Sequence, residues 1–208
     1  MRSSSLLNIH SYSFVIVYSA LLSRVLMINH MRAYVLLLKQ DDPKKCTALR
    51  LVKTGLACPI QSLANDMIVL NPFANRVLCK TDSSMATSMC GIDCSWNLAE
   101  SVLKISRFTN KGILRRVPSL LAGNPINYSK LGRLSTVEAL SGCYYIMGFK
   151  DVAQLMLNKF KWGHTFLELN RNALDDYNLA TNPGEIAQIE EEYFGNYKQW
   201  KEYTVSKK

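Results

Sequence analysis

The residues best suited to chemistry are Asp93 and Trp96, in the run Gly91-Ile92-Asp93-Cys94-Ser95-Trp96. Residues 88–93 are expected to form a strand, so a carboxylate and a large ring stand at its end, where α/β proteins bind ligands. The carboxylate is the candidate proton acceptor and the ring the candidate ligand contact. The alternative is structural: Asp93 or Ser95 caps the next helix, and Trp96 fills the core.

Metal and nucleophile chemistry have little support in the sequence. Six cysteines are present, but the nearest two, Cys90 and Cys94, are not a C-x-x-C pair and have no second pair to complete a zinc site. Because the cysteines lie in apolar stretches, we expect reduced thiols rather than disulfides. His164 is expected to be structural, at a helix start. The sequence contains no P-loop, G-x-G-x-x-G or G-x-S-x-G motif, and we expect no metal.

Charge is distributed unevenly along the chain. The 208 residues carry 25 Lys and Arg against 16 Asp and Glu, a formal net charge of +9. This balance favours a polyanionic partner. Two segments without an acid suit phosphate contacts along RNA, although a solvated basic face of an ordinary protein is the alternative. Their basic residues are Lys44, Lys45, Arg50 and Lys53 in one, and Lys104, Arg107, Lys111, Arg115, Arg116, Lys130 and Arg133 in the other.

Short apolar runs alternate with helical patterns, which indicates an α/β fold ending in a helical tail. Ser135 and Glu138 form a capping-box pattern at the start of one helix. The chain has no internal repeat. Strands are expected over 32–38, 67–70, 88–93 and 113–121, the last broken by Pro118, and a loop over 81–88. Helices are expected over about 47–55, 97–108, 135–147, 150–159, 164–178 and 184–203.

The first 30 residues differ from the rest. Their apolar run, Phe14 to Leu22, is much shorter than the ~20 residues that a membrane-spanning helix needs. Arg24 interrupts the place where a signal-peptide cleavage pattern is expected. We therefore favour Met31 as the true start, with a poorly packed or disordered extension over 1–30 as the alternative.

Five motifs follow one another along the chain: Asp41-Asp42-Pro43-Lys44-Lys45-Cys46-Thr47, Asp93-Cys94-Ser95-Trp96, Asn124-Pro125-Ile126-Asn127-Tyr128, Leu134-Ser135-Thr136-Val137-Glu138-Ala139 and Lys159-Phe160-Lys161-Trp162-Gly163-His164-Thr165-Phe166-Leu167-Glu168-Leu169-Asn170. In this order they closely resemble the small-subunit ribosomal RNA aminocarboxypropyltransferases of archaea and eukaryotes. The resemblance covers roughly residues 32 to 180 and leaves 1–30 unmatched.

The resemblance implies a small N-terminal α/β domain over residues 31–96 and a SPOUT-like, trefoil-knotted α/β domain with a helical tail over 97–208. S-adenosylmethionine is expected to bind between them as the donor of its 3-amino-3-carboxypropyl group. The acceptor is expected to be N3 of a pseudouridine, N1-methylated or not, in small-subunit rRNA or a pre-ribosomal particle, and methylthioadenosine the other product. The resemblance implies a cytoplasmic enzyme, expected to be a monomer without membrane contact.

The family also implies which residues hold the cofactor. The main chain of Ile92 is expected to hold the ribose, and Thr47, Thr136 and Leu140 the methionine end. Before the capping box the sequence departs from the family pattern and has Ser129 and Gly132, so the contact expected at Gly132 can only be a main-chain contact. The adenine is expected among Leu70, Pro72, Trp96, Val117, Leu134 and Ala139.

Within this scheme Asp93 is expected to act as general base for the N3 proton or as a partner for the sulfonium. The pocket would select the transferred carbon by proximity and alignment. Two alternatives stay open. A SPOUT-type RNA methyltransferase would yield S-adenosylhomocysteine, and a non-catalytic RNA-binding assembly factor would need no cofactor.

Overall fold

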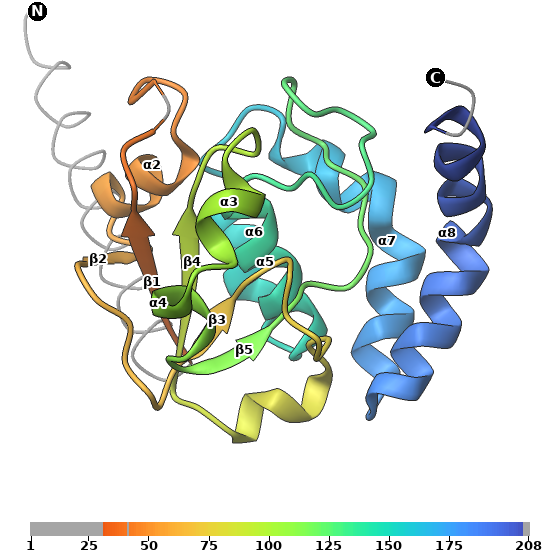
Figure 1. Ribbon diagram of the computed structural model, residues 1–208, viewed down its shortest axis with the longest axis horizontal. Helices are drawn as coiled ribbons and strands as arrows, with labels where there is room; N and C mark the ends of the chain where they lie inside the picture. The colour runs from red at the N-terminus through yellow and green to blue at the C-terminus, as the bar shows by residue number, and fades with distance from the viewer. Residues whose placement is uncertain (1–30, 41, 206–208) are drawn as a thin grey trace, which may run out of the picture.

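The computed structural model describes residues 31–40 and 42–205, so the predictions for residues 1–30 lie outside the described residues. In the described part of the chain, five strands form one parallel sheet in the order β2-β1-β4-β3-β5 (Figure 1). The strands are β1 (Arg32–Leu37), β2 (Cys58–Ile60), β3 (Ile68–Leu70), β4 (Ser88–Asp93) and β5 (Ile113–Arg115). The predicted α/β fold class is therefore confirmed.

Helices cover both faces of this sheet, as a parallel sheet requires. Successive strand residues point to opposite faces: Val35 and Ile68 belong to one hydrophobic cluster, and Leu36 and Val69 belong to the other. The first cluster packs under α2 (Thr47–Lys53), α5 (Thr136–Ile146) and α6 (Lys150–Leu157), and the second under α3 (Ala99–Leu103) and α4 (Ser106–Thr109). In Figure 1, α3 and α4 accordingly lie in front of the sheet, and α5 and α6 behind it.

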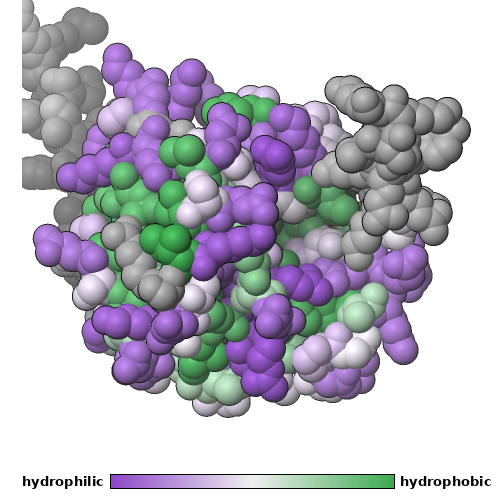
Figure 2. All heavy atoms as spheres, viewed as in Figure 1, coloured by the Kyte–Doolittle hydropathy of each residue, from purple (hydrophilic) through white to green (hydrophobic). Residues whose placement is uncertain are grey.

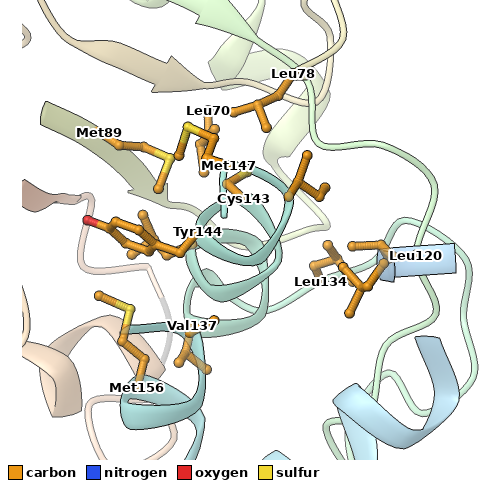
Figure 3. Close-up of a cluster of buried hydrophobic side chains, with 14 of the residues drawn as sticks. Leu70, Leu78, Met89, Leu120, Leu134, Val137, Cys143, Tyr144, Met147 and Met156 are labelled. Carbon is orange, nitrogen blue, oxygen red and sulfur yellow. The ribbon is translucent and has the colours of Figure 1, made fainter. Parts of the chain in front are cut away.

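Helix α5 runs through the centre of the larger cluster. Val137, Cys143 and Tyr144 are fully buried, and Figure 3 shows side chains from the sheet, the loops and α6 gathered around this helix. The Tyr144 hydroxyl donates a 2.7 Å hydrogen bond to the carbonyl of Met31, which satisfies a buried polar group. The helix stops as predicted at Gly148, whose φ of 93° is a left-handed conformation that favours glycine.

Two long helices complete the fold. Helices α7 (Gly163–Leu179) and α8 (Pro183–Val205) pack side by side at one edge (Figure 1). The buried Asn170 of α7 accepts a 2.7 Å hydrogen bond from the amide of Leu121 and donates a 2.9 Å bond to its carbonyl. This exchange fixes the loop after β5 against α7.

Most predicted elements are present, and the differences have local causes. The helix expected over 97–108 is split into α3 and α4, because the buried amide of Asn71 binds the carbonyls of Leu103 and Phe108. The strand expected over 113–121 ends at Arg115, ahead of Pro118, which has no N–H for a ladder. Strand β2 was not predicted: it is a three-residue edge strand that contains Pro59. A 3₁₀ turn, η1 (Lys80–Ser84), occupies part of the expected loop.

The predicted boundary between two domains lies after residue 96. In the structure β5 lies beyond that point and pairs with β3, and the larger hydrophobic cluster combines Val35 and Met89 with Leu140 and Leu174. The two parts therefore share one sheet and one core, and the division into two domains stays a prediction.

Candidate active site

The candidate site lies at the carboxyl edge of the parallel sheet. Strand register places Leu70 of β3 beside Gly91 of β4 and Arg115 of β5, so the chain leaves these strands close together. A cleft of about 1040 Å³ opens there, bounded by α2, by the loop of residues 116–135 and by the start of α5. Strand ends of this kind are the usual ligand sites of α/β folds.

Nearly all the predicted cofactor residues meet in this cleft. The exception is Leu140, which is fully buried on α5 and does not line it. Leu140 instead packs behind Gly91, where a Cβ atom would come within 3.4 Å of its Cγ and 3.0 Å of Thr136 Cγ2. Leu140 therefore supports the cleft floor, and its contact with the methionine end of the cofactor stays a prediction. The residues that do line the cleft are Thr47, Leu70, Pro72, Ile92, Trp96, Val117, Gly132, Leu134, Thr136 and Ala139.

Asp93 is the polar centre of the cleft. Its Oδ1 accepts a 2.9 Å hydrogen bond from the Thr136 hydroxyl, and its Oδ2 accepts a 3.2 Å bond from the Cys46 thiol. Burial and, to a smaller extent, the nearby Asp93 carboxylate together raise the pKa of Cys46 to about 11, so this thiol holds its proton. The hydrogen bonds of the Asp93 side chain thus join the starts of α2 and α5, whereas the start of α3 has no side-chain cap bond of the kind that the capping alternative requires.

The starts of α2 and α5 also touch each other directly. The Val137 amide donates to Thr47 Oγ1 across 3.4 Å, and the Cys46 sulfur accepts from the Leu49 amide at 3.3 Å as the N-cap of α2. Two hydroxyls and one carboxylate are therefore collected from three segments far apart in the sequence.

Trp96 forms one wall of the apolar part of the cleft. Its indole N–H donates a 2.9 Å hydrogen bond to the carbonyl of Leu134, and the ring is only partly buried. The Arg133 guanidinium lies 5.9 Å from the ring centroid. Trp96 therefore lines the cleft and at the same time packs against the smaller hydrophobic cluster, as the core-filling alternative expects in part.

The predicted RNA-contacting residues separate into groups. Lys44, Lys45, Arg50, Lys130 and Arg133 are exposed and line the cleft. In Figure 2 hydrophilic side chains gather at the top of the view, over α2 and the loop before it. Three others, Lys53, Lys104 and Lys111, are exposed but do not line this cleft, and nothing is described of the Arg107 side chain.

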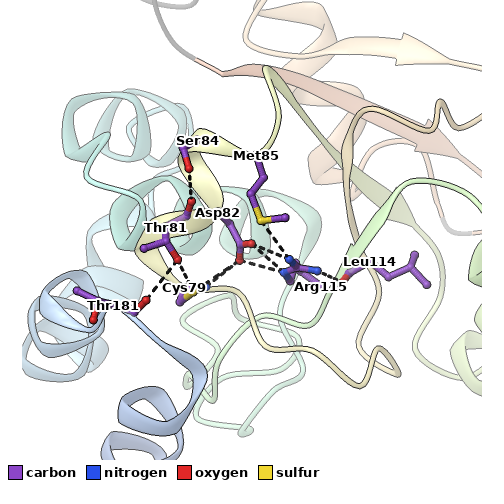
Figure 4. Close-up of polar contacts among 8 residues, drawn as sticks. All are labelled: Cys79, Thr81, Asp82, Ser84, Met85, Leu114, Arg115 and Thr181. Atoms are coloured by element: carbon purple, nitrogen blue, oxygen red, sulfur yellow. Dashed lines mark hydrogen bonds and ion pairs between the residues drawn. The ribbon is translucent and has the colours of Figure 1, made fainter.

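Arg116 and Arg115 are held by acids from distant segments. Arg116 reaches the cleft wall, but its guanidinium pairs with Glu190 of α8 at 2.7 and 2.8 Å. Arg115 is only 5% exposed, and its guanidinium binds both carboxylate oxygens of Asp82 at 2.8 to 3.0 Å (Figure 4). The prediction that Arg115 contacts RNA is therefore corrected: its charge is used inside the fold.

Glu138 forms more hydrogen bonds than the capping-box pattern predicts. The capping box is present, with the Ser135 amide 2.7 Å from Glu138 Oε2. The same fully buried carboxylate accepts bonds from the Gly123 and Asn124 amides, at 2.7 and 2.9 Å, and from the Asn124 side chain at 2.7 Å. It thereby anchors the loop that borders the cleft.

Further cleft residues were missed by sequence reasoning. Phe160 and Trp162, which precede α7, line the cleft together with residues 124–127. Both groups belong to motifs of the family resemblance, but neither motif contains a charge pattern that assigns it to this site. The one sequence signal that could have pointed to Phe160 and Trp162 is that two aromatic side chains stand in an otherwise basic and polar run.

Comparison with known proteins gives consistent matches. A family described as "Ribosome biogenesis protein, C-terminal" matches residues 68–194. The 16S rRNA aminocarboxypropyltransferase of Thermoplasma acidophilum is 44% identical over 164 residues, 77% of this chain and 98% of the relative. The 16S rRNA aminocarboxypropyltransferase of Methanobrevibacter smithii is 39% identical over 168 residues, which cover 78% of this chain and 97% of the relative. The solved structure of "the SAM-dependent rRNA:acp-transferase Tsr3 from Vulcanisaeta distributa" matches with a TM-score of 0.68 and 38% sequence identity. The match covers 77% of this chain and 87% of that structure's chain.

A second family, described as a possible Fer4-like domain in RNase L inhibitor, matches residues 31–61. An iron–sulfur cluster is held by four cysteine thiolates, whereas this segment contains only Cys46 and Cys58. The Cys46 thiol is hydrogen-bonded to Asp93, and the described residues contain no group of three or more His, Cys, Asp or Glu side chains that could hold a metal. The residues present do not fit an iron–sulfur cluster.

Proposed function

The chain belongs to the family of the 16S rRNA aminocarboxypropyltransferases, and we propose that it transfers the 3-amino-3-carboxypropyl group of S-adenosylmethionine to small-subunit ribosomal RNA. The observation that carries the proposal is the single cleft in which an apolar wall, the Asp93–Thr136–Cys46 cluster and exposed basic side chains meet. The enzymatic class and the cofactor follow from the named relatives, which match over three quarters of the chain.

The residues present fit S-adenosylmethionine. The cleft volume of about 1040 Å³ lies at the upper end of the usual range for ligand pockets. Trp96 and the apolar residues around it offer a slot for a flat aromatic base, while Thr47, Asp93 and Thr136 offer hydrogen-bonding groups for an amino-acid arm. When bound, the cofactor supplies a sulfonium whose attached carbons are open to nucleophilic attack.

Selection of the carboxypropyl carbon is a matter of position. The Thr136 and Thr47 hydroxyls are held at fixed places by Asp93 and by the Val137 amide, respectively. We expect these side chains to orient the amino-acid arm toward the open, basic side of the cleft, while the apolar wall holds the opposite part of the molecule. The main chain of Ile92 is the proposed contact for the ribose.

For the acceptor we propose N3 of a pseudouridine, N1-methylated or not. A bond forms between N3 and the Cγ carbon, the carbon–sulfur bond breaks, and methylthioadenosine leaves. The N3 proton must be removed, and we propose that Asp93, the carboxylate hydrogen-bonded to Thr136 and Cys46 in the cleft, receives it. Each of its oxygens already accepts one bond, and a carboxylate has lone pairs for more.

Lys44, Lys45, Arg50, Lys130 and Arg133 are proposed to contact RNA phosphates beside the cleft. What supports this role is that they are exposed and line the cleft, unlike Arg115. Phosphate contacts of this kind make affinity depend on salt rather than on sequence.

The organisation implied by the family also stays a proposal. We propose a trefoil knot in residues 97–208, and what supports it is the loop of residues 116–135, closed by the Leu121–Leu131 bridge and followed at once by α5 under the sheet. Tracing an experimental structure of the chain tests it. A monomeric, cytoplasmic enzyme is proposed likewise. Among the described helices, none is both long enough and apolar enough to cross a bilayer.

Product analysis tests the function. The purified chain is incubated with small-subunit RNA and S-adenosylmethionine labelled at the carboxyl carbon, and the RNA is digested to nucleosides. Label in a nucleoside, with methylthioadenosine as the second product, is expected. S-adenosylhomocysteine would instead indicate methyl transfer, and failure to bind the cofactor at all would indicate a non-catalytic RNA-binding protein.

A further inference from the structure

Part of the cleft lining has no role in the scheme above. Phe160 and Trp162, which connect α6 to α7, line the cleft on the side of α2. In Figure 1, α2, the start of α7 and the loop near residue 125 all lie at the top of the molecule, the end toward which the strand arrows of β1 and β4 point.

The two rings and one guanidinium form a compact group. The ring centroids of Phe160 and Trp162 are 5.2 Å apart with planes inclined by 42°, and the Arg50 guanidinium lies 5.1 Å from the Phe160 centroid. Phe160 is 9% exposed and is fixed between the core and Arg50, whereas Trp162 is only partly buried. Trp162 is therefore the ring of this group that can offer a face to a ligand.

This aromatic group lies close to the reacting groups. Asp93 binds Cys46, and the Arg50 amide binds the carbonyl of Cys46 one helical turn later on α2. One turn of α-helix advances about 5.4 Å, so the backbone of Arg50 stands roughly one turn of α2 from Cys46, and Phe160 lies against the Arg50 guanidinium. Trp162 and Asp93 line the same cleft, so a nucleobase at Trp162 and a group held at Asp93 would share that cleft.

The surrounding charge indicates what kind of ligand this ring meets. Lys44, Lys45 and Arg50 are exposed on the same side of the cleft, and none of the three forms an ion pair with an acid among the residues that the structure describes. Aromatic rings beside a basic groove are the usual platform for single-stranded nucleic acid, in which bases stack on rings and phosphates meet cations. A purely structural ring packed on the core would not require this accompanying charge.

We propose that Trp162, supported by Phe160 and flanked by Arg50, is the stacking surface for the unpaired nucleotide of the RNA substrate. The proposal rests on the proposed function, because modification at N3 needs the Watson–Crick edge of a base. Enzymes reach such an edge by taking the base out of the helix and stacking it between side chains. The apolar wall at Trp96 then serves the cofactor, and Trp162 serves the acceptor.

The test measures how tightly the chain binds a ten-nucleotide oligouridine and an abasic strand of equal length, both at one low salt concentration. Trp162→Leu keeps an apolar side chain without a ring, and Trp162→Phe keeps a ring. We expect Trp162→Leu to bind oligouridine roughly 5- to 150-fold more weakly, the range for loss of one base–aromatic stack, with little change for the abasic strand. Trp162→Phe should keep most of the affinity.

Lys45→Met is the comparison for charge and is expected to weaken binding of both strands alike. The stacking role would be overturned if Trp162→Leu weakened binding of both strands equally or changed binding of neither. It would also be overturned if Trp162→Leu and Trp162→Phe lost the same affinity for oligouridine. Melting temperatures of the variants are measured in parallel.

A second measurement needs no variant. Oligouridine containing 4-thiouridine is photo-crosslinked to the wild-type chain, and a crosslinked peptide that includes Trp162 is expected. Crosslinks confined to other peptides overturn the proposal. Neither experiment uses the transfer reaction, so the two proposals can fail separately. If the stacking tests succeed and the labelled-cofactor assay fails, only the proposed function is overturned. If the labelled-cofactor assay succeeds and the stacking tests fail, only the stacking role is overturned.

Discussion

At the scale of single residues, Asp93 is held by neutral donors rather than by a cation. Thr136 and Cys46 each give it one hydrogen bond, and within the described part of the chain it forms no ion pair. Such a carboxylate keeps its charge available for a ligand, whereas a carboxylate bound by a guanidinium has already been neutralised, as Asp82 is by Arg115.

The first prediction concerns the chemistry of Asp93. In Asp93→Asn the side chain keeps its size but cannot accept the N3 proton, so we expect kcat for transfer to fall about 100-fold or more, within the usual range for a general base. Cofactor affinity should change much less. Single-turnover rates and equilibrium binding of the cofactor check this. Full turnover of Asp93→Asn would exclude the base role.

The second prediction separates two basic residues that look alike in the sequence. Arg115→Met removes one partner of a buried ion pair and leaves Asp82 uncompensated, which costs about 3–5 kcal/mol of unfolding free energy. Lys45→Met removes an exposed charge at the cleft, so stability stays within about 0.5 kcal/mol. Urea unfolding of the two variants checks the contrast.

RNA binding should show the opposite pattern. Lys45→Met is expected to reduce by about one the slope of log affinity against log salt, while folded Arg115→Met keeps the parent slope. A reduced slope for Arg115→Met, measured below its unfolding transition, would contradict the buried role assigned to Arg115.

At the scale of elements, the start of α5 connects the loop, the sheet and α2. Glu138 binds Gly123 and Asn124, Thr136 binds Asp93, and the Val137 amide binds Thr47. One helix start thus sets the positions of both walls of the cleft, which is why its N-terminal turn carries polar residues that are buried or half-buried.

The third prediction tests this anchoring. Glu138→Gln replaces one acceptor oxygen by a donor that faces N–H groups, so we expect a loss of about 1–3 kcal/mol of unfolding free energy. Hydrogen exchange at the Gly123 and Asn124 amides should become faster. Glu168→Gln, at an exposed position on α7, is the matched control and should leave both quantities as in the parent. Unchanged exchange at these amides in Glu138→Gln would contradict the anchoring role.

At the scale of the whole molecule, the parallel sheet brings the site together. Residues near 47, 70, 93, 117 and 136 meet only because β1, β3, β4 and β5 all end at one edge. The core beneath this edge also contains ionisable groups. Burial raises the pKa of Cys90 to about 12, and burial also raises the pKa values of Cys143 and Tyr144.

The fourth prediction follows from these buried groups. The folded chain holds their protons more tightly than the unfolded chain, so their contribution to stability is complete below the ordinary thiol pKa of 9.0 and is lost as pH rises toward 12. Each such thiol contributes a slope of up to about 1.4 kcal/mol per pH unit in that window. Urea unfolding at pH 8, 9 and 10 measures the total slope.

Cys90→Ala should flatten this dependence, whatever it does to stability at pH 8. Cys58→Ala removes an exposed thiol and is the matched control. A Cys90→Ala chain with the same alkaline slope as the control would contradict the assignment of that slope to the buried thiol.

Much of this protein could be predicted from its sequence. Strand and helix patterns are local, and the strands at 32–37, 68–70 and 88–93 and the helices from residue 136 onward lie within a few residues of their predicted ranges. The order of the motifs predicted the family, and the residues carried over from it line one cleft, apart from Leu140. These features could be predicted because they depend on the types of side chains at short spacing along the chain.

Only the tertiary structure decided the roles of particular polar residues. Arg115 and Arg116 are adjacent in the sequence, yet their partners, Asp82 and Glu190, lie 33 and 74 positions away. The capping box at Glu138 is visible in the sequence, but its bonds to Gly123 and Asn124 are not. The physical reason is that hydrogen bonding and desolvation depend on neighbours in space, and chain folding, rather than local sequence, determines those neighbours.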